Sequence, residues 1–157
     1  MSKITLFWFR RDLRLADNAG LYRALKASKN VQPIFIFDKN ILDKLEDKDD
    51  RRVSFIFTYV EKLKHELEQL SSTLWVFYGE PISIYKKLIE THSIEALYAN
   101  RDYEPYARER DKAVFEMLAE KDIPFKAFKD HVVFEKDEVL KDDGAPYVVY
   151  SPYAKRW

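Results

Sequence analysis

Short apolar runs alternate along this chain with longer stretches in which apolar residues recur every three or four positions. The first run, Ile4 to Phe9, contains one polar residue, Thr5, which is typical of a strand covered on both faces of a sheet. It ends abruptly at Arg10. The apolar runs together predict five buried strands, over residues 4–9, 31–37, 73–78, 96–100 and 125–128.

The segments between these runs have the spacing of amphipathic helices. The first helix follows a cap at Asp17-Asn18. The third begins at Pro81, a favoured early helical position, and the fourth near Tyr106. The predicted inward-facing residues are Leu21, Tyr22 and Leu25 of the first helix, Val53, Ile56, Val60, Leu63, Leu67 and Leu70 of the second, Ile82, Tyr85, Leu88 and Ile89 of the third, and Val114, Met117 and Leu118 of the fourth.

Strict alternation of strands and helices predicts a doubly wound α/β fold with a five-stranded parallel sheet in a single domain. Right-handed crossovers favour the strand order 3-2-1-4-5. Residues 39–50 are expected to form an acidic loop after the second strand. Because ligands of such sheets bind beyond the carboxyl ends of the strands, we expect a site above strands one, two and four.

Composition removes several classes of function. Lysine plus arginine and aspartate plus glutamate both number 27, so the 157-residue chain has no overall basic field for coating nucleic acid. The absence of cysteine excludes disulfides and thiolate chemistry within it. Glycine occurs only at positions 20, 79 and 144, so neither a G-x-G-x-x-G turn nor a Walker loop is present.

The remaining polar residues give no convincing catalytic or metal site. The three histidines, His65, His92 and His131, are scattered, and we expect structural or surface roles for them. No early run resembles a signal peptide, and none approaches the roughly 20 apolar residues of a membrane span. A cytoplasmic domain with no membrane partner is therefore expected.

Arginines gather where the predicted strands end and helices begin. Arg10, Arg11 and Arg14 follow the first strand, and Arg101 follows the fourth. The guanidinium fork suits carboxylates, phosphates and stacked rings. Two interpretations remain open: neighbouring carboxylates pair with these arginines and stiffen the loops, or the cluster holds an anionic, aromatic ligand. The other arginines of the cluster are Arg51 and Arg52 at the second helix and Arg108 and Arg110 at the fourth.

Three segments resemble the amino-terminal domain of the DNA photolyase/cryptochrome family. They are residues 7–18 (FWFRRDLRLADN), residues 100–111 (NRDYEPYARERD), and residues 144–153 (GAPYVVYSPY) with Trp157. They occur in the family's order, and the likeness spans essentially the whole chain. Residues 1–130 then correspond to the family's Rossmann-like domain, and residues 131–157 to the start of the linker toward a helical domain that carries FAD.

The resemblance implies that this domain holds a light-harvesting antenna pigment. In such enzymes the antenna passes its excitation to FAD in the second domain, which repairs cyclobutane pyrimidine dimers in DNA. The chain is then expected to be a fragment that is inactive alone, with damaged DNA reached only through the full-length protein. Two alternatives stay open: a cryptochrome photoreceptor domain, and a free-standing nucleotide-binding α/β module, which would be expected to carry a glycine-rich loop after the fourth strand.

The resemblance also bears on the pigment. Folate-binding members carry an Asn-Glu pair where this chain has Tyr106 and Ala107, so FMN or 8-hydroxy-5-deazaflavin is favoured over methenyltetrahydrofolate. Phe35 and Phe37 are expected as apolar walls, although Phe35 also suits a simple core position. Further candidates are Asp38 and Asp102 as acceptors for ring N–H groups, Arg11 and Arg52 toward phosphate or ring oxygens, and Phe9, Arg10, Asn100, Glu104 and Arg108.

Overall fold

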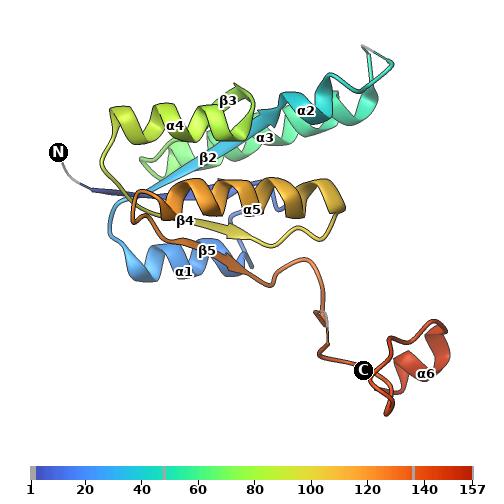
Figure 1. Ribbon diagram of the computed structural model, residues 1–157. Coiled ribbons are helices and arrows are strands. Elements are labelled where there is room, and N and C mark those ends of the chain that lie inside the picture. Colours follow the sequence, from blue (N-terminus) through green and yellow to red (C-terminus); the bar gives the residue numbers. More distant parts are fainter. Residues whose placement is uncertain (1–2, 48, 136, 157) are drawn as a thin grey trace.

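The computed structural model describes residues 3–47, 49–135 and 137–156. Five parallel strands form one sheet in the order β3-β2-β1-β4-β5, as the sequence predicts (Figure 1). The central strand β1 pairs with β2 on one side and β4 on the other. The strands are β1 (Ile4–Phe9), β2 (Val31–Asp38), β3 (Trp75–Gly79), β4 (Ile94–Asn100) and β5 (Phe125–Phe128).

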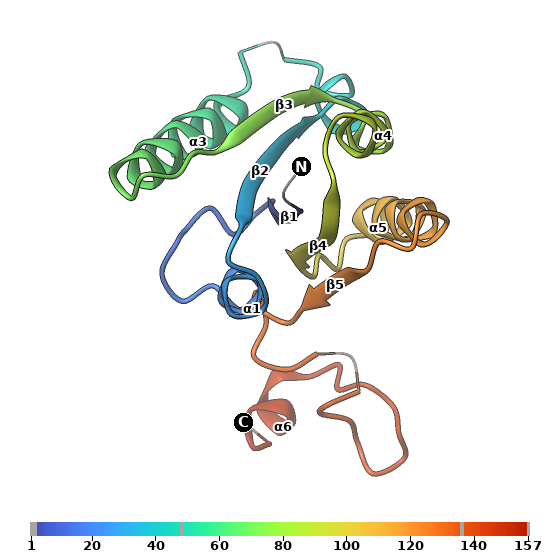
Figure 2. The ribbon, with the colours of Figure 1, turned by 90° about the vertical axis from the view of Figure 1, so that its left-hand side faces the viewer.

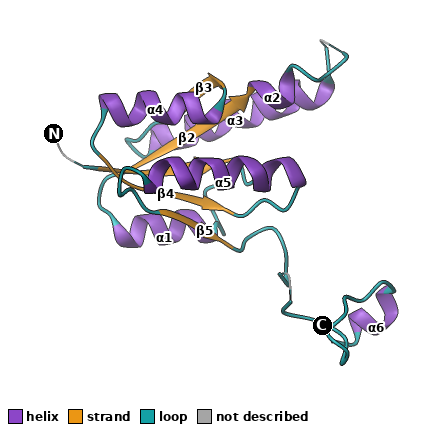
Figure 3. Cartoon of the chain, in the orientation of Figure 1, coloured by secondary structure: helices purple, strands orange, loops and turns teal. Residues whose placement is uncertain are grey.

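Helices cover both faces of the sheet. Figure 2 shows α1 and α3 on one side and α4 and α5 on the other, which is the doubly wound arrangement. Figure 3 shows the strands as a layer between these helices. None of the described helices is long and apolar enough to cross a membrane. The helices are α1 (Ala19–Ala27), α2 (Lys39–Leu42), α3 (Arg51–Gln69), α4 (Pro81–Thr91), α5 (Pro105–Ala119) and α6 (Tyr150–Ala154).

Alternation along β1 divides the core into two halves. Trp8 packs with Tyr85 and Leu118 on the α4–α5 face, whereas Phe7 and Phe9 pack with residues of α1 and α3 on the other. Successive side chains of a strand point to opposite faces, so an uninterrupted apolar run fills both halves. This explains why the first strand lacks polar alternation.

The first helix buries a different face from the predicted one. Tyr22 and Leu25 are 57% and 60% exposed, so assigning them to the core was wrong, while Leu21 is buried as expected. The buried residues beside it are Gly20 and Ala24. Gly20 has no side chain and Ala24 only a methyl group, so α1 can lie close to β1 and β4. This close approach leaves Tyr22 and Leu25 facing outward.

Two other expectations need correction. Leu70 is 68% exposed because α3 ends at Gln69, which leaves Leu70 as its C-cap rather than part of the buried stripe. Residues 39–42, predicted as loop, form the short helix α2, because the Asp38 side chain caps it by accepting from the Asn40 N–H.

After β5 the chain leaves the sheet and ends near α6, which lies apart from the layers in Figure 1. The first part of this segment after β5 is held by Glu135. The Glu135 carboxylate accepts hydrogen bonds from Arg101 and, at 2.7 Å, from the Tyr103 hydroxyl. Phe134 and Tyr147 both contact the Tyr153 ring. Trp157, part of the third resembling segment, lies outside the described residues.

Candidate functional site at the carboxyl edge of the sheet

A pocket of about 390 Å³ opens above the carboxyl ends of β1 and β2. Its walls come from β2, α2, α3 and α5, and its mouth from the loop after β4, so segments far apart in the sequence meet there. This is the position at which open α/β sheets bind ligands. The lining residues are Arg10, Arg11, Phe35, Ile36, Phe37, Asp38, Ile41, Leu42, Ile56, Asp102, Glu104, Tyr106, Ala107 and Arg110.

The inner wall is a buried charged stack on Trp8. The guanidinium carbons of Arg10 and Arg110 lie 4.9 and 4.7 Å from the centre of the Trp8 ring. Both arginines share one counter-ion: Arg10 Nη1 donates to the two Asp111 oxygens at 2.6 and 2.5 Å, and Arg110 Nη2 donates to Oδ1 at 3.0 Å. Asp38, 3.8 Å from Arg110 Nη1, balances the second cation, so the wall offers guanidinium N–H donors to a ligand without a net charge.

A second wall pairs an acid with a phenol. The Tyr106 hydroxyl donates to Asp38 Oδ2 at 2.8 Å, and Arg110 Nη1 lies 3.8 Å from the same oxygen. Burial raises the pKa of Tyr106 above its usual value, and the hydrogen bond to Asp38 raises it further. The Asp38 carboxylate also accepts from the Asn40 N–H as the cap of α2. It is therefore held in place by Tyr106, Arg110 and Asn40.

The mouth is charged, and the opposite wall is apolar. Arg11 Nε lies 3.5 Å from Asp102 Oδ2, and Arg11 Nη1 lies 3.6 Å from Glu104 Oε1. The Arg11 side chain is 61% exposed, so an incoming anion can reach its guanidinium. Phe35 and Phe37 meet edge to face, with ring centres 4.9 Å apart. An apolar ring system and an anionic group can thus be accommodated at opposite ends of the pocket.

Seven of the eleven residues proposed from the sequence line this pocket, and four lie elsewhere. Phe9 is fully buried in the core. Arg108 is exposed on α5. Arg52 also points away, because its guanidinium binds the cap residue Asp50 and lowers the pKa of that carboxyl to about 2. The seven that line the pocket are Arg10, Arg11, Phe35, Phe37, Asp38, Asp102 and Glu104.

Asn100, the fourth, belongs to a closed polar network on the α1 side. Its Nδ2 donates to Asp12 at 2.6 Å and to Asn18 at 2.8 Å, while its Oδ1 accepts from the Gly20 N–H at 2.8 Å. A Cβ on Gly20 would lie only 2.6 Å from that oxygen, so the glycine is required for this contact. The network joins β4 to the start of α1 and leaves the Asn100 amide with its hydrogen-bonding groups already paired.

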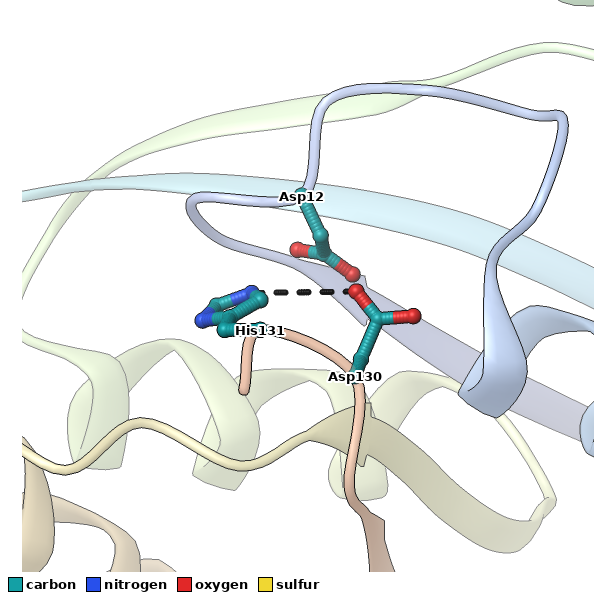
Figure 4. A group of neighbouring side chains, drawn as sticks. All are labelled: Asp12, Asp130 and His131. Carbon is teal, nitrogen blue, oxygen red and sulfur yellow. Dashed lines mark ion pairs between the residues drawn. The ribbon is translucent and has the colours of Figure 1, made fainter. Parts of the chain in front are cut away.

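A group of three ionisable side chains lies beside this network. Figure 4 shows Asp130 and His131, from the segment after β5, close to Asp12 on the loop after β1. Their nearest ligand-type atoms lie within 4.8 Å of one another. However, Asp130 accepts from Arg14 at 2.8 Å and from the Ala19 N–H at 3.0 Å. Asp130 therefore ties the segment after β5 to the loop after β1 and to the start of α1.

Several pocket residues were not singled out as ligand contacts in the sequence. Ile41 and Leu42 come from α2, which looked like a loop, and Ile56 was assigned to the core stripe of the second helix. Arg110 was recognised as part of the arginine cluster, but its position inside the pocket depends on how α5 is rotated. The one available signal was its spacing of four residues from Tyr106, which puts both on one face of a helix.

The three segments noted in the sequence supply this edge of the sheet and the tail beyond it. A sequence model described as DNA photolyase matches residues 5–157. The chain belongs to the DNA photolyase family. Its α/β fold is therefore that of a photolyase amino-terminal domain, and the pocket lies where the family's first two motifs meet.

Individual relatives agree with this assignment. The deoxyribodipyrimidine photo-lyase of Synechococcus sp. is 35% identical over 157 residues, which are all of this chain and 32% of the relative. Cryptochrome-1 of Gallus gallus is 27% identical over 147 residues, 93% of this chain and 24% of that protein. The chain thus spans about a third of the length of the photolyase and a quarter of that of the cryptochrome.

A solved structure is similar over the same region. An archaeal photolyase from Sulfolobus tokodaii, described as having two FAD molecules and as implying a novel light-harvesting cofactor, superposes with a TM-score of 0.80. The two chains are 35% identical, and the match covers 88% of this chain and 32% of the archaeal one.

Proposed function

We propose that this chain is the light-harvesting domain of a DNA photolyase and that its pocket holds a flavin-type antenna pigment. The observation that carries the proposal is the pocket itself, in which aromatic walls, a fixed carboxylate and an exposed guanidinium surround about 390 Å³. That volume lies within the roughly 300–1,000 Å³ of small-molecule sites. When bound, the pigment supplies the absorption of light.

The residues divide the work of binding. Phe35 and Phe37 pack against the flat face of the ring system, and Asp38 accepts from a ring N–H. Arg11 turns from its carboxylate partners to a phosphate or ring oxygen. The guanidinium groups of Arg10 and Arg110 stabilise electron-rich carbonyls on the ring edge.

The choice of pigment has support from two sides. Tyr106 and Ala107, which occupy the positions of the folate-binding pair, both line the pocket, and Tyr106 is already bonded to Asp38. The second FAD of the Sulfolobus tokodaii photolyase makes a flavin the favoured class, so FAD joins FMN and 8-hydroxy-5-deazaflavin as a candidate.

The rest of the function belongs to a longer protein. We infer that a helical domain with the catalytic FAD follows this one in the complete cytoplasmic enzyme and repairs cyclobutane pyrimidine dimers in DNA. The higher identity to the photolyase than to the cryptochrome, 35% against 27%, favours repair over signalling. This chain alone is then expected to bind pigment without repairing DNA.

Titration of the purified chain with four pigments tests the proposal: FMN, FAD, 8-hydroxy-5-deazaflavin and methenyltetrahydrofolate, each followed by fluorescence. We expect a flavin to bind, the folate to bind at least tenfold more weakly, and Arg11→Ala to weaken flavin binding about tenfold, the equivalent of one charge-assisted hydrogen bond.

Arg156→Ala is the matched control, because Arg156 is an exposed arginine that pairs with Asp142, outside the pocket. The Arg156→Ala variant should bind flavin with the same affinity as the unmodified chain. Tighter binding of the folate, or equal loss in the two arginine variants, would contradict the flavin pocket.

A further inference from the structure

The outer edge of the sheet at β3 is open. β3 pairs with β2 through Trp75 to Gly79 without a register shift, and β2 lies on one side only. Among the described residues, the backbone of 75–79 makes no hydrogen bond outside that ladder. In a parallel strand, alternate residues direct both backbone groups away from the neighbour, so the free edge offers unpaired donors and acceptors.

This edge lacks the usual protection against pairing. Natural edge strands carry lysine, proline or a bulge, or are very short. The sequence of β3 is WVFYG, with none of these residues, and Val76 and Tyr78 are 41% and 63% exposed. The opposite edge, β5, is four residues long and carries Lys126. The two edges therefore differ in the feature that controls strand addition.

A groove of about 790 Å³ follows the open edge. On one side of the sheet Trp75 and Phe77 pack toward Leu88 of α4, and on the other Leu74 packs with the α3 cluster. A strand laid along β3 would therefore place alternate side chains against α3 and α4. The lining of the groove includes the consecutive residues 73–78 of the edge, which suits an extended peptide.

Both helical walls of the groove carry a positive charge. Lys64 comes from α3 and Lys87 from α4, and no acidic residue is among the described residues that line it. The nearest carboxylate oxygen to Lys64, on Glu68, is 4.0 Å away, at the limit of an ion pair. A segment with carboxylates on both of its faces would complement this arrangement.

We propose that the β3 edge is the docking site for an extended, acidic and apolar segment of a partner protein, which adds to the sheet as a sixth strand. Main-chain hydrogen bonds to β3 hold the segment, its apolar residues cover Trp75, Val76 and Phe77, and its carboxylates meet Lys64 and Lys87. This site lies across β2 from the carboxyl-edge pocket and does not depend on the proposed pigment.

A fluorescently labelled heptapeptide, Glu-Val-Val-Glu-Val-Val-Glu, is the probe, because its glutamates fall on both faces of a strand. Anisotropy at low salt measures binding, and hydrogen exchange at residues 75–79 reports the ladder. We expect exchange to slow on binding. The lysine counterpart, Lys-Val-Val-Lys-Val-Val-Lys, and the proline counterpart, Glu-Val-Pro-Glu-Val-Pro-Glu, which cannot form the ladder, should each bind at least tenfold more weakly.

Charge reversal gives the decisive comparison. The double variant Lys64→Glu and Lys87→Glu should lose at least tenfold in affinity for the acidic peptide and gain affinity for the lysine peptide. Lys112→Glu on α5 is the matched control and should change neither, since Lys112 is an exposed lysine outside the groove. Unchanged affinity in the double variant, or equal binding of the proline peptide, would overturn the proposal. So would a dimer of this chain that Tyr78→Lys dissociates, because a second copy would then occupy the edge.

Discussion

Two polar clusters occupy the same edge of the sheet, a few residues apart, and they differ in kind. On the α1 side, Asp12, Asn18 and Asn100 satisfy one another and the end of a helix, with no space left between them. On the α5 side, Asp38 and Arg110 line an open pocket. Asp12, Asn18, Asn100 and Arg110 belong to the segments 7–18 and 100–111, whereas Asp38 ends β2.

The difference shows what separates a structural network from a binding site. The closed network uses short side chains whose donors and acceptors match, so burial costs little. The open pocket uses long side chains stacked on an indole, and its lining leaves charged groups of both signs facing a cavity. A ligand adds nothing to the first cluster, whereas it completes the second.

The largest expected effect comes from breaking the closed network. Asn100→Ala leaves the Gly20 N–H buried without an acceptor and removes two donors, which should lower the free energy of unfolding by about 2–4 kcal/mol. Urea unfolding measures this. At a temperature where the variant stays folded, its affinity for flavin should be unchanged. A loss of flavin binding without unfolding would show that Asn100 contacts the pigment.

A smaller effect should follow from neutralising the open pocket. Asp38→Asn keeps a good helix cap for α2, because asparagine serves there as well as aspartate. Stability should therefore stay within about 1 kcal/mol, while flavin affinity falls about tenfold through loss of the charged acceptor. Asp142→Asn, at an exposed carboxylate outside the pocket, is the control for titration. If Asp38→Asn and Asp142→Asn bound flavin with equal affinity, Asp38 would not be a pigment contact.

The smallest effect concerns alkaline stability. Burial and Asp38 raise the pKa of Tyr106 in the folded state, so the proton leaves more readily from the unfolded chain, near pH 10. The stabilising contribution of Tyr106 is therefore complete below pH 10 and is lost as pH rises through the folded pKa. Tyr106→Phe should make the decline of stability above pH 10 shallower, as measured by urea unfolding at several pH values. An identical slope would show that Tyr106 titrates alike in both states.

The sequence was sufficient for the layout of the fold because each strand is an uninterrupted apolar run with helical spacing between runs. It also placed Asp38 and Arg11 at the carboxyl edge of the sheet, since Asp38 ends β2 and Arg11 is the second residue after β1. Position along a strand does not reveal toward which side of the sheet a side chain at the strand end turns. Asn100 and Asp38 both lie at strand ends, but Asn100 joins the closed network on the α1 side and Asp38 lines the pocket on the α5 side. Likewise, α1 faces inward with Gly20 and Ala24 because close approach outweighs the burial of Tyr22, a balance that apolar spacing cannot express.

Tryptophan is placed so that each site has its own optical reporter. Trp8 lies against the Arg10 and Arg110 guanidinium groups that line the pocket, and Trp75 lines the groove at β3. A pigment above Trp8 would quench it by energy transfer, whereas a strand laid on Trp75 would shift its emission by displacing water. Two unlabelled variants, each with Trp157 and one of the pair replaced by phenylalanine, therefore report occupancy of the pocket and of the edge separately.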